Sequence, residues 1–277
     1  MTLESRHIVI VGAGKVGTSL SLAFKKTHKH ISLVGKNEAD QLEAVAVADL
    51  ILITTQDGEI QNVCQHIAPT IRTGTVVAHC SGSMDSSSLK SAKKRGAYVG
   101  SAHPLNTFPN KTAATEILTK KSHGTYCFIS GSKQATNLLC NVFTKIGFIT
   151  NVLDDSKKVA YHTACVFLCN YLTSLSEIGL STAESAGLDR DNFWQATQPL
   201  IQSTLRNITS HGTSHSLSGP IARGDYNTVS SHIEILSSLT DTTQIAYKTL
   251  GLEALKLAQQ RGELSVYQIN KLKEILS

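Results

Sequence analysis

The sequence predicts an α/β domain with a doubly wound parallel sheet, followed by an all-α C-terminal domain. Up to residue 153, short aliphatic runs alternate with segments of helical periodicity, which is the order of a parallel sheet with crossover helices. From residue 154 onward no convincing strand remains and helical periodicity dominates. The length of 277 residues suits two modest domains, which we place at residues 1–153 and 154–277.

A glycine motif follows the first aliphatic run. Residues 6–11 lead directly into G-x-G-x-x-G at residues 12–17; a helix is expected over residues 18–29 and a second strand over residues 30–35. This strand–turn–helix–strand context is the one that a dinucleotide-binding fingerprint requires. The first domain is therefore predicted to be Rossmann-like and dinucleotide-binding, and the alternative is a purely structural glycine loop.

Each glycine of the motif has a physical task. Gly12 permits the tight turn off the strand, Gly14 lets the backbone approach a pyrophosphate, and Gly17 lets the helix pack closely on the sheet. Lys15 and Val16 lie between the glycines, at the approach to the helix, whose free N–H groups and positive dipole end would face the anion. We expect all five residues to contact the cofactor.

The end of the second strand indicates which dinucleotide binds. An NAD site usually has Asp or Glu there to bond the ribose 2′-hydroxyl, but this strand ends at Val34-Gly35 with no acid. Lys36 and Asn37 stand where a 2′-phosphate would lie, and a cation there favours NADP over NAD. The alternative is a solvated lysine near a turn.

The remaining elements continue the alternation. A truncated helix is expected over residues 36–48, because that segment is short for a full crossover. Further strands are expected at residues 49–55, 75–80, 97–103, 125–130 and 148–153, and further helices of the first domain at 58–68, 86–95 and 133–145. Helices of the second domain are expected at residues 157–186, 190–209, 228–239, 242–261 and 265–276. Glycines and prolines separate these segments.

Polar residues follow the predicted strands at the carboxyl edge of the sheet, where doubly wound proteins bind ligands. Thr55 and Gln56 follow the third strand and could contact the pyrophosphate or the nicotinamide ribose; the alternative is an ordinary polar loop. Ser81 follows the fourth strand, where its hydroxyl could position a substrate near the nicotinamide. We interpret all three as candidate site residues.

His103 ends the fifth predicted strand and is held by the rigid Pro104. A histidine with a pKa near neutrality can donate a proton to a carbonyl or imine. The alternative is a turn histidine that bonds a backbone carbonyl. We favour the catalytic interpretation.

The first helix of the second domain carries a polar stripe. Lys158 and His162 are four residues apart and share a face, which Cys165 and Cys169 continue, and Asn170 lies about a quarter-turn away. Lys158 could polarise a carbonyl or bind a carboxylate, His162 could donate a proton, and Asn170 could position the substrate. The alternatives are a solvated lysine and a packed histidine. The cysteines show no CxxC spacing, and we expect no metal site.

Two glycines and a proline hold the loop at residues 217–225 around Arg223 and Asp225. We expect these two side chains to form a structural ion pair. The alternative is that Arg223 reaches a substrate carboxylate, either in its own chain or across a dimer interface.

Composition excludes several classes of protein. The formal charge of +5 comes from scattered lysines without an aromatic-interleaved basic stripe, so nucleic-acid binding is not expected. No apolar stretch approaches the length of a membrane span, and no signal peptide is apparent. The six cysteines lie mostly in apolar runs, as buried thiols of a reduced compartment do, so we predict a cytoplasmic protein.

Five motifs in order resemble a bacterial family of Rossmann-like NADP oxidoreductases with a C-terminal helical domain of unknown function: VGAGKVG, VVAHCSG, SAHPLNTF, KKVAYHTACVFLCNYL, and LSGPIARGD with His232. That family is similar to deazaflavin-dependent NADP oxidoreductases, pyrroline-5-carboxylate reductases and β-hydroxyacid dehydrogenases. The resemblance implies an NADP-type Rossmann domain and homodimers formed through the helical domain, without an established substrate.

This chain departs from its relatives at two positions. The family more often has Arg where Lys36 stands, and Lys keeps the charge but loses the bidentate fork. The β-hydroxyacid dehydrogenases have Asn one helical turn after their catalytic Lys, whereas His162 stands one turn after Lys158. Their mechanism therefore cannot be transferred to this chain.

The leading hypothesis is an NADP(H)-dependent oxidoreductase acting on a small keto, imino or hydroxy acid that bears a carboxylate. His103 or His162 would donate the proton, and Lys158, Ser81 and Asn170 would bind or position the substrate. The alternative hypothesis is a non-catalytic NADP(H)-binding redox sensor or scaffold dimer.

Overall fold

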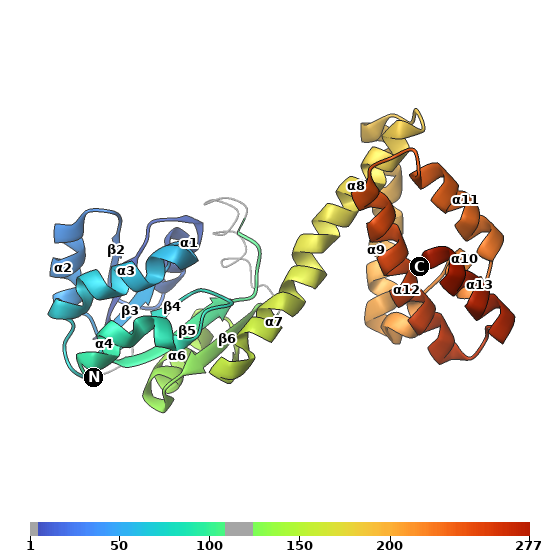
Figure 1. The fold of residues 1–277 in the computed structure, drawn as a ribbon. Helices are drawn as coiled ribbons and strands as arrows, with labels where there is room; N and C mark the ends of the chain where they lie inside the picture. The colour runs from blue at the N-terminus through green and yellow to red at the C-terminus, as the bar shows by residue number, and fades with distance from the viewer. Residues whose placement is uncertain (1–4, 109–123) are drawn as a thin grey trace. The chain divides into compact units, whose positions relative to one another are not determined.

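The computed structural model describes residues 5–108 and 124–277. The chain divides into two compact units, Met1–Leu168 and Cys169–Ser277 (Figure 1). The division falls later than the predicted boundary between residues 153 and 154. The helix that begins at Lys158 therefore belongs with the sheet.

The first unit is built on a seven-stranded sheet with the order β2-β1-β3-β4-β5-β6-β7. Its strands are β1 (His7–Val11), β2 (His30–Val34), β3 (Leu50–Ile53), β4 (Val76–His79), β5 (Tyr98–Pro104), β6 (Tyr126–Gly131) and β7 (Ile149–Val152). The order reverses between β1 and β3, and ligands of doubly wound proteins bind beyond the carboxyl ends of strands at such a switch point. The predicted Rossmann-like fold class is confirmed.

One pair of neighbouring strands departs from the predicted parallel sheet. β5 and β6 are antiparallel, and Pro104, the last residue of β5, is opposite Cys127, near the start of β6. Leu105 N–H also donates to Tyr126 O, at 2.8 Å. The chain therefore leaves β5 and enters β6 at the same edge of the sheet, which needs no crossover. The other neighbouring pairs are parallel, as predicted.

Short helices connect and cover the strands. They are α1 (Lys15–Phe24), α2 (Glu38–Ala46), α3 (Asp57–Ile67), α4 (Lys90–Lys94), α6 (Lys133–Lys145) and α7 (Lys158–Cys165). α6 has its predicted bounds, and α2 is the predicted truncated helix. α1 begins earlier than predicted, directly after Gly14, and ends at Phe24 because Lys26 and Thr27 bond back three residues and tighten the last turn.

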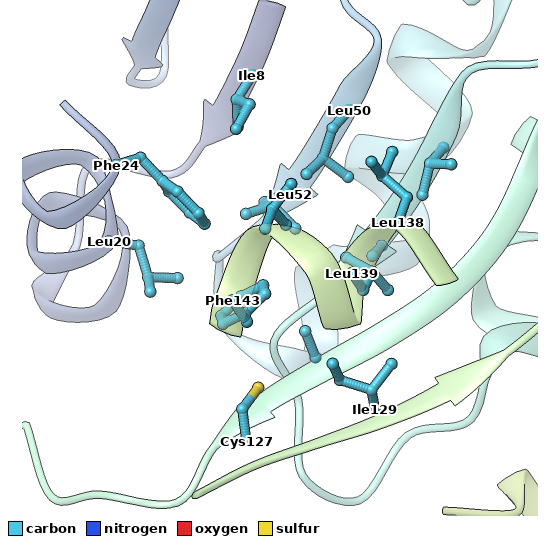
Figure 2. Close-up of a cluster of buried hydrophobic side chains, with 14 of the residues drawn as sticks. Ile8, Leu20, Phe24, Leu50, Leu52, Cys127, Ile129, Leu138, Leu139 and Phe143 are labelled. Atoms are coloured by element: carbon cyan, nitrogen blue, oxygen red, sulfur yellow. The ribbon is translucent and has the colours of Figure 1, made fainter. Parts of the chain in front are cut away.

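Helices cover apolar side chains on both faces of the central strands. On one face, Ile8 packs in a cluster with Phe24 of α1 and Phe143 of α6, whose rings lie edge to face at 5.6 Å (Figure 2). Its neighbour Val9 belongs to the cluster on the opposite face, with Ile60 of α3. Alternate residues of a strand point to opposite faces, which explains why these strands are apolar throughout.

The second unit contains helices and no strand among its residues, all of which the structure describes. They are α8 (Tyr171–Ser185), α9 (Arg190–Ser216), α10 (Pro220–Arg223), α11 (Tyr226–Leu236), α12 (Asp241–Arg261) and α13 (Val266–Leu276). Leu255 of α12 and Leu272 of α13 lie in its core. Gly251 lets α12 and α13 pack closely, since a Cβ there would lie 2.6 Å from Leu276 Cδ2. The predicted all-α class of this region is confirmed.

A long helical stretch joins α7 to α8 through a π-helical turn at Val166–Asn170. Within the described residues, Asp155–Ser185 is long and apolar enough to cross a membrane by length and composition alone, since an 18-residue window inside it has a mean hydropathy of 1.2. The prediction that no apolar stretch approaches that length is therefore wrong. The first turn of the Asp155–Ser185 stretch carries Lys158, whose ammonium is buried against residues of the sheet.

Candidate active site

The glycine loop after β1 requires glycine at two positions, one because of its backbone conformation and one because a Cβ has no space there. Gly12 has φ +119°, and a Cβ on Gly17 would lie 1.9 Å from Gly12 O. Thr54, after β3, fixes the loop by donating its hydroxyl to Gly12 O at 2.8 Å. The loop is thereby held at the switch point of the sheet.

Gly14 has a different environment from the other two glycines. A Cβ there would meet nothing within 4 Å, and its φ of −76° is open to any residue. Gly14 is the N-cap of α1, yet no side chain caps the helix. Space and uncapped N–H groups at a helix N-terminus fit a pyrophosphate. Lys15 and Val16 form the first turn of α1.

Thr55 adds a second observation at the same loop. Its backbone N would lie 3.0 Å from a Cβ on Gly12, and its buried hydroxyl has no hydrogen-bond partner among residues 5–108 and 124–277. Buried polar atoms without partners are rare, and a bound group is one explanation for them. Gln56 beside it is exposed at the N-cap of α3. The residues at this edge therefore fit a dinucleotide.

The loop after β2 presents one cation and no strand-end acid. Lys36 is exposed and makes no ion pair with the described residues. Asn37 caps α2, since its Oδ1 accepts from Ala39 N at 3.0 Å and Asp40 N at 3.4 Å. That oxygen thus has a structural task, and Lys36 is the group available to a 2′-phosphate.

A buried lysine lies beneath the carboxyl ends of β4 and β5. Lys158 is 2% exposed, and its Nζ donates to Ser101 Oγ at 2.6 Å and to Ser81 O at 3.1 Å. Burial lowers the pKa of the ammonium, and Asp155 is the strongest of the groups that oppose this shift. The contacts of the ammonium are protein oxygens.

Two imidazoles meet at Gly82, which follows Ser81. A Cβ on Gly82 would lie 2.5 Å from His162 Cδ2 and 3.0 Å from His103 Nε2, and the ring centroids of the two histidines are 6.1 Å apart. Only a glycine leaves this space, so Gly82 shapes the site, although it was not among the residues predicted from the sequence. Gly82 could have been identified from its position directly after Ser81, a candidate residue at the end of a predicted strand.

His103 is neutral at physiological pH. Burial lowers its pKa to about 4, and the positive charges of Lys158 and His162 act in the same direction. The expected pKa near neutrality is therefore wrong, because the side chain is held inside the fold. Its Nδ1 lies 2.8 Å from the Tyr161 hydroxyl, and burial raises the pKa of this phenol, which stays protonated.

The Ser81 hydroxyl holds its own loop together. It donates to Asp57 Oδ2 at 2.7 Å and accepts from Met84 N at 3.1 Å. Ser81 N–H donates to His79 Nδ1 at 3.2 Å, so His79 carries its proton on Nε2 and donates to Asp85 O at 3.0 Å. Burial lowers the pKa of His79 to about 4.

Four further polar residues of the site, Ser101, Ser130, Asp155 and Ser86, were not predicted from the sequence. Ser101 Oγ and Ser130 Oγ are 2.8 Å apart, Ser130 Oγ donates to Asp155 Oδ1 at 2.5 Å, and Ser86 Oγ donates to Asp155 Oδ2. Ser101 alternates with His103 along β5, so the two side chains share a face of the strand. This spacing of two residues in a strand could have identified Ser101 as a site residue from the sequence.

The other predicted site residues lie in the second unit. Asn170 is exposed in the π-helical turn. The expected ion pair of Arg223 with Asp225 is wrong, because Asp225 instead caps α11 by accepting from Thr228 N at 3.1 Å. Within the described residues, no group of three or more His, Cys, Asp or Glu could hold a metal ion.

The doubly wound sheet and its glycine loop define the class of the first unit as Rossmann-like. Residues 3–104 match the model of a Rossmann-like domain, and residues 125–254 match DUF2520, a domain of unknown function. The chain therefore combines a Rossmann-like domain with a DUF2520 domain, which confirms the predicted resemblance. No curated protein matches the chain.

Solved structures share the fold at low sequence identity. A candidate NADP oxidoreductase from Bacteroides fragilis, BF3122, is 19% identical with a TM-score of 0.72, over 92% of this chain and 100% of its own. Protein TM1727 from Thermotoga maritima is 20% identical with a TM-score of 0.71, over 92% and 99%. An imine reductase from Myxococcus stipitatus in complex with NADP+ is 12% identical with a TM-score of 0.63, over 98% and 100%. These similarities concern the fold.

Proposed function

We propose that this protein is an NADP(H)-dependent oxidoreductase acting on a small keto, imino or hydroxy acid. The observation that carries the proposal is the presence, in one unit, of an open glycine loop at Gly14 and an imidazole pair at Gly82. A bound nicotinamide would supply or accept hydride, and the protein would orient the reactants and move a proton. A protein that only bound the dinucleotide would not need the imidazole pair.

The loop at residues 12–17 would hold the pyrophosphate, and Lys36 the 2′-phosphate. The solved structure of the imine reductase from Myxococcus stipitatus with NADP+ supports this choice of cofactor. Thr55, with its unpartnered hydroxyl, would complete the contacts.

His162 is the proposed proton donor, because it is half-buried at Gly82 and faces His103. His103, which is neutral, would hold the substrate through a hydrogen bond at Nε2, while the Tyr161 hydroxyl holds its Nδ1. Asn170 and Arg223 stay predictions as substrate contacts.

The cofactor is tested by titrating the protein separately with NADPH and NADH. We expect tighter binding of NADPH, and Lys36→Glu should weaken it by about tenfold or more, since a charge-assisted contact is lost. Lys29→Glu is the matched control, because Lys29 is exposed just before β2 and Lys36 just after it. Tighter NADH binding, or equal losses in both variants, would contradict the assignment.

Activity is tested by following NADPH oxidation with a panel of small keto and imino acids. We expect His162→Ala to lose turnover while its NADPH affinity stays unchanged. Turnover equal to that of the unmodified protein would remove His162 from the mechanism. Absence of any turnover, with NADPH bound tightly, would favour the redox-sensor alternative.

We further propose a cytoplasmic homodimer that pairs through the second unit. Large apolar side chains are exposed there, among them Leu200 and Ile235. An open pocket of about 580 Å³ has mostly apolar walls, including Leu175 and Leu250. Light scattering of the purified protein tests this, and a monomer at all concentrations would refute it.

A further inference from the structure

Four side chains of the first unit form an uninterrupted hydrogen-bonded chain from a buried cation to a carboxylate. Lys158 Nζ lies 2.6 Å from Ser101 Oγ, which lies 2.8 Å from Ser130 Oγ, which lies 2.5 Å from Asp155 Oδ1. Both serines are 0–1% exposed. These residues come from β5, β6 and the start of the helix that follows β7.

The direction of every bond in this chain is fixed by chemistry. An ammonium can only donate, so Ser101 Oγ accepts from Lys158. A carboxylate can only accept, so the single proton of Ser130 goes to Asp155. Ser130 then has no proton left for Ser101, and the Ser101 hydroxyl must donate to Ser130. The chain therefore runs one way, from the positive end to the negative end.

This arrangement gives the buried ammonium a counter-charge without a direct ion pair. Burial of an unpaired lysine favours its neutral form. The direct partners of Lys158 are neutral, Ser101 Oγ and Ser81 O. Asp155 supplies the opposite charge through the serines, and Ser86 holds its second oxygen.

The same ammonium fixes the loop beneath the two imidazoles. It donates to the carbonyl of Ser81, and the next residue is Gly82, against which His103 and His162 pack. A shift of this carbonyl would move Gly82 into the imidazoles or away from them. The position of Lys158 is therefore linked to the geometry of the proposed catalytic pair.

We infer that Asp155, Ser130 and Ser101 are positioning residues that hold Lys158 charged and in place, so that it sets Gly82 between His103 and His162. The inference rests on the proposed function for its catalytic meaning. The hydrogen-bonded chain itself is tested without substrate or cofactor.

Other titratable groups also face Lys158 and must be separated from Asp155. Asp57, at the start of α3, is bonded to Ser81 and lies outside the chain. Burial raises the pKa of the Cys80 and Cys127 thiols, which stay neutral. The neutral imidazoles of His79 and His103 also face Lys158. Asp85 interacts with the ammonium as well; its pKa is lowered first by a hydrogen bond from Ser87, and it lies outside the hydrogen-bonded chain.

The test measures the titration of Lys158 by NMR of the full chain labelled with ¹³C-lysine. The Lys158 signal is identified by its absence from Lys158→Met. The Asp155→Asn variant should lower the pKa of Lys158 by about one unit or more, as loss of a close opposite charge does. Ser130→Ala should shift it in the same direction, because the break isolates the carboxylate.

Matched controls separate the chain from general effects. Asp154→Asn removes the same charge from an exposed neighbour of Asp155. Ser132→Ala removes a hydroxyl, two residues from Ser130, that makes no hydrogen bond within the part of the chain that the structure describes. Both should leave the titration of Lys158 in place. Ser130→Ala deletes only one oxygen and changes no charge. It therefore tests the chain independently if Asp155→Asn reduces the folded population.

An unchanged titration in Asp155→Asn, or a Lys158 already neutral at pH 7 in the unmodified protein, overturns the inference. A shift in Asp155→Asn alone removes the serines from it. NADPH binding measured on the same samples separates this result from the proposed function, because the titration of Lys158 needs no cofactor. Where turnover is found, Asp155→Asn should lower kcat and leave the KM for NADPH unchanged.

Discussion

Acidification should destabilise the fold through His79, and replacement of this histidine should remove that part of the loss. His79 is fully buried and its pKa falls from the ordinary 6.5 to about 4. Between these values the unfolded chain binds a proton that the folded chain does not, so stability falls as pH falls. Above pH 6.5 His79 is neutral in both states and the fold keeps its full stability with respect to this group. Below about pH 4 His79 is protonated in both states, and further acidification costs no more stability through it.

The magnitude follows from the size of the shift. One pKa unit corresponds to about 1.4 kcal/mol, so the difference at about pH 4.5 amounts to about 2.5 kcal/mol. That is a large part of the stability of an ordinary domain. His103 acts in the same direction with the same sign, since its pKa is also lowered to about 4.

The assay is urea unfolding at about pH 7.5 and about pH 4.5. His79→Gln removes the titrating group and keeps a donor for Asp85 O. The variant should be less stable at the higher pH but should lose about 2.5 kcal/mol less on acidification. Comparison of the variant with the unmodified protein cancels the carboxylates common to both. If the two proteins lose the same free energy, the buried neutral His79 is not the cause.

Further predictions concern the glycines and the loop that they shape. Gly14→Ala should fold normally, because its Cβ meets open space, yet lose NADPH affinity by fluorescence titration, because the pyrophosphate would meet the methyl group. Gly17→Ala should lower the melting temperature, since its Cβ would lie 1.9 Å from Gly12 O; an equal effect of the two substitutions would contradict this distinction. Gly82→Ala should abolish turnover in the NADPH oxidation assay without weakening NADPH binding, and unchanged turnover would show that the imidazole pair tolerates a wider spacing.

The glycine loop could be predicted from the sequence because its determinants are local. Gly12 and Gly17 are required by the backbone over a few residues, and the apolar runs on either side fix the strand and helix. The antiparallel pairing of β5 and β6 could not be predicted in the same way. A strand of either direction has the same alternating pattern, and the pairing of Pro104 with Cys127 is a contact between distant residues.

The candidate site was predicted in part for the same reason. Lys158, His162 and His103 were identified by residue type and position, and the structure brings them to Gly82 and Ser81. The protonation state of each group could not be predicted from the sequence, because it depends on burial in the folded chain. A serine in an aliphatic strand, such as Ser101, also gives no sign of a partner as distant in sequence as Ser130.

The antiparallel pair of β5 and β6 bears on how this chain can be divided. The Rossmann-like match ends at residue 104, in the last residue of β5, and the DUF2520 match begins at residue 125, just before β6. A boundary drawn from family matches thus cuts one continuous sheet and separates Ser101 from Ser130. Neither matched segment should fold as an independent module, and exchange of one segment between relatives should require exchange of the other.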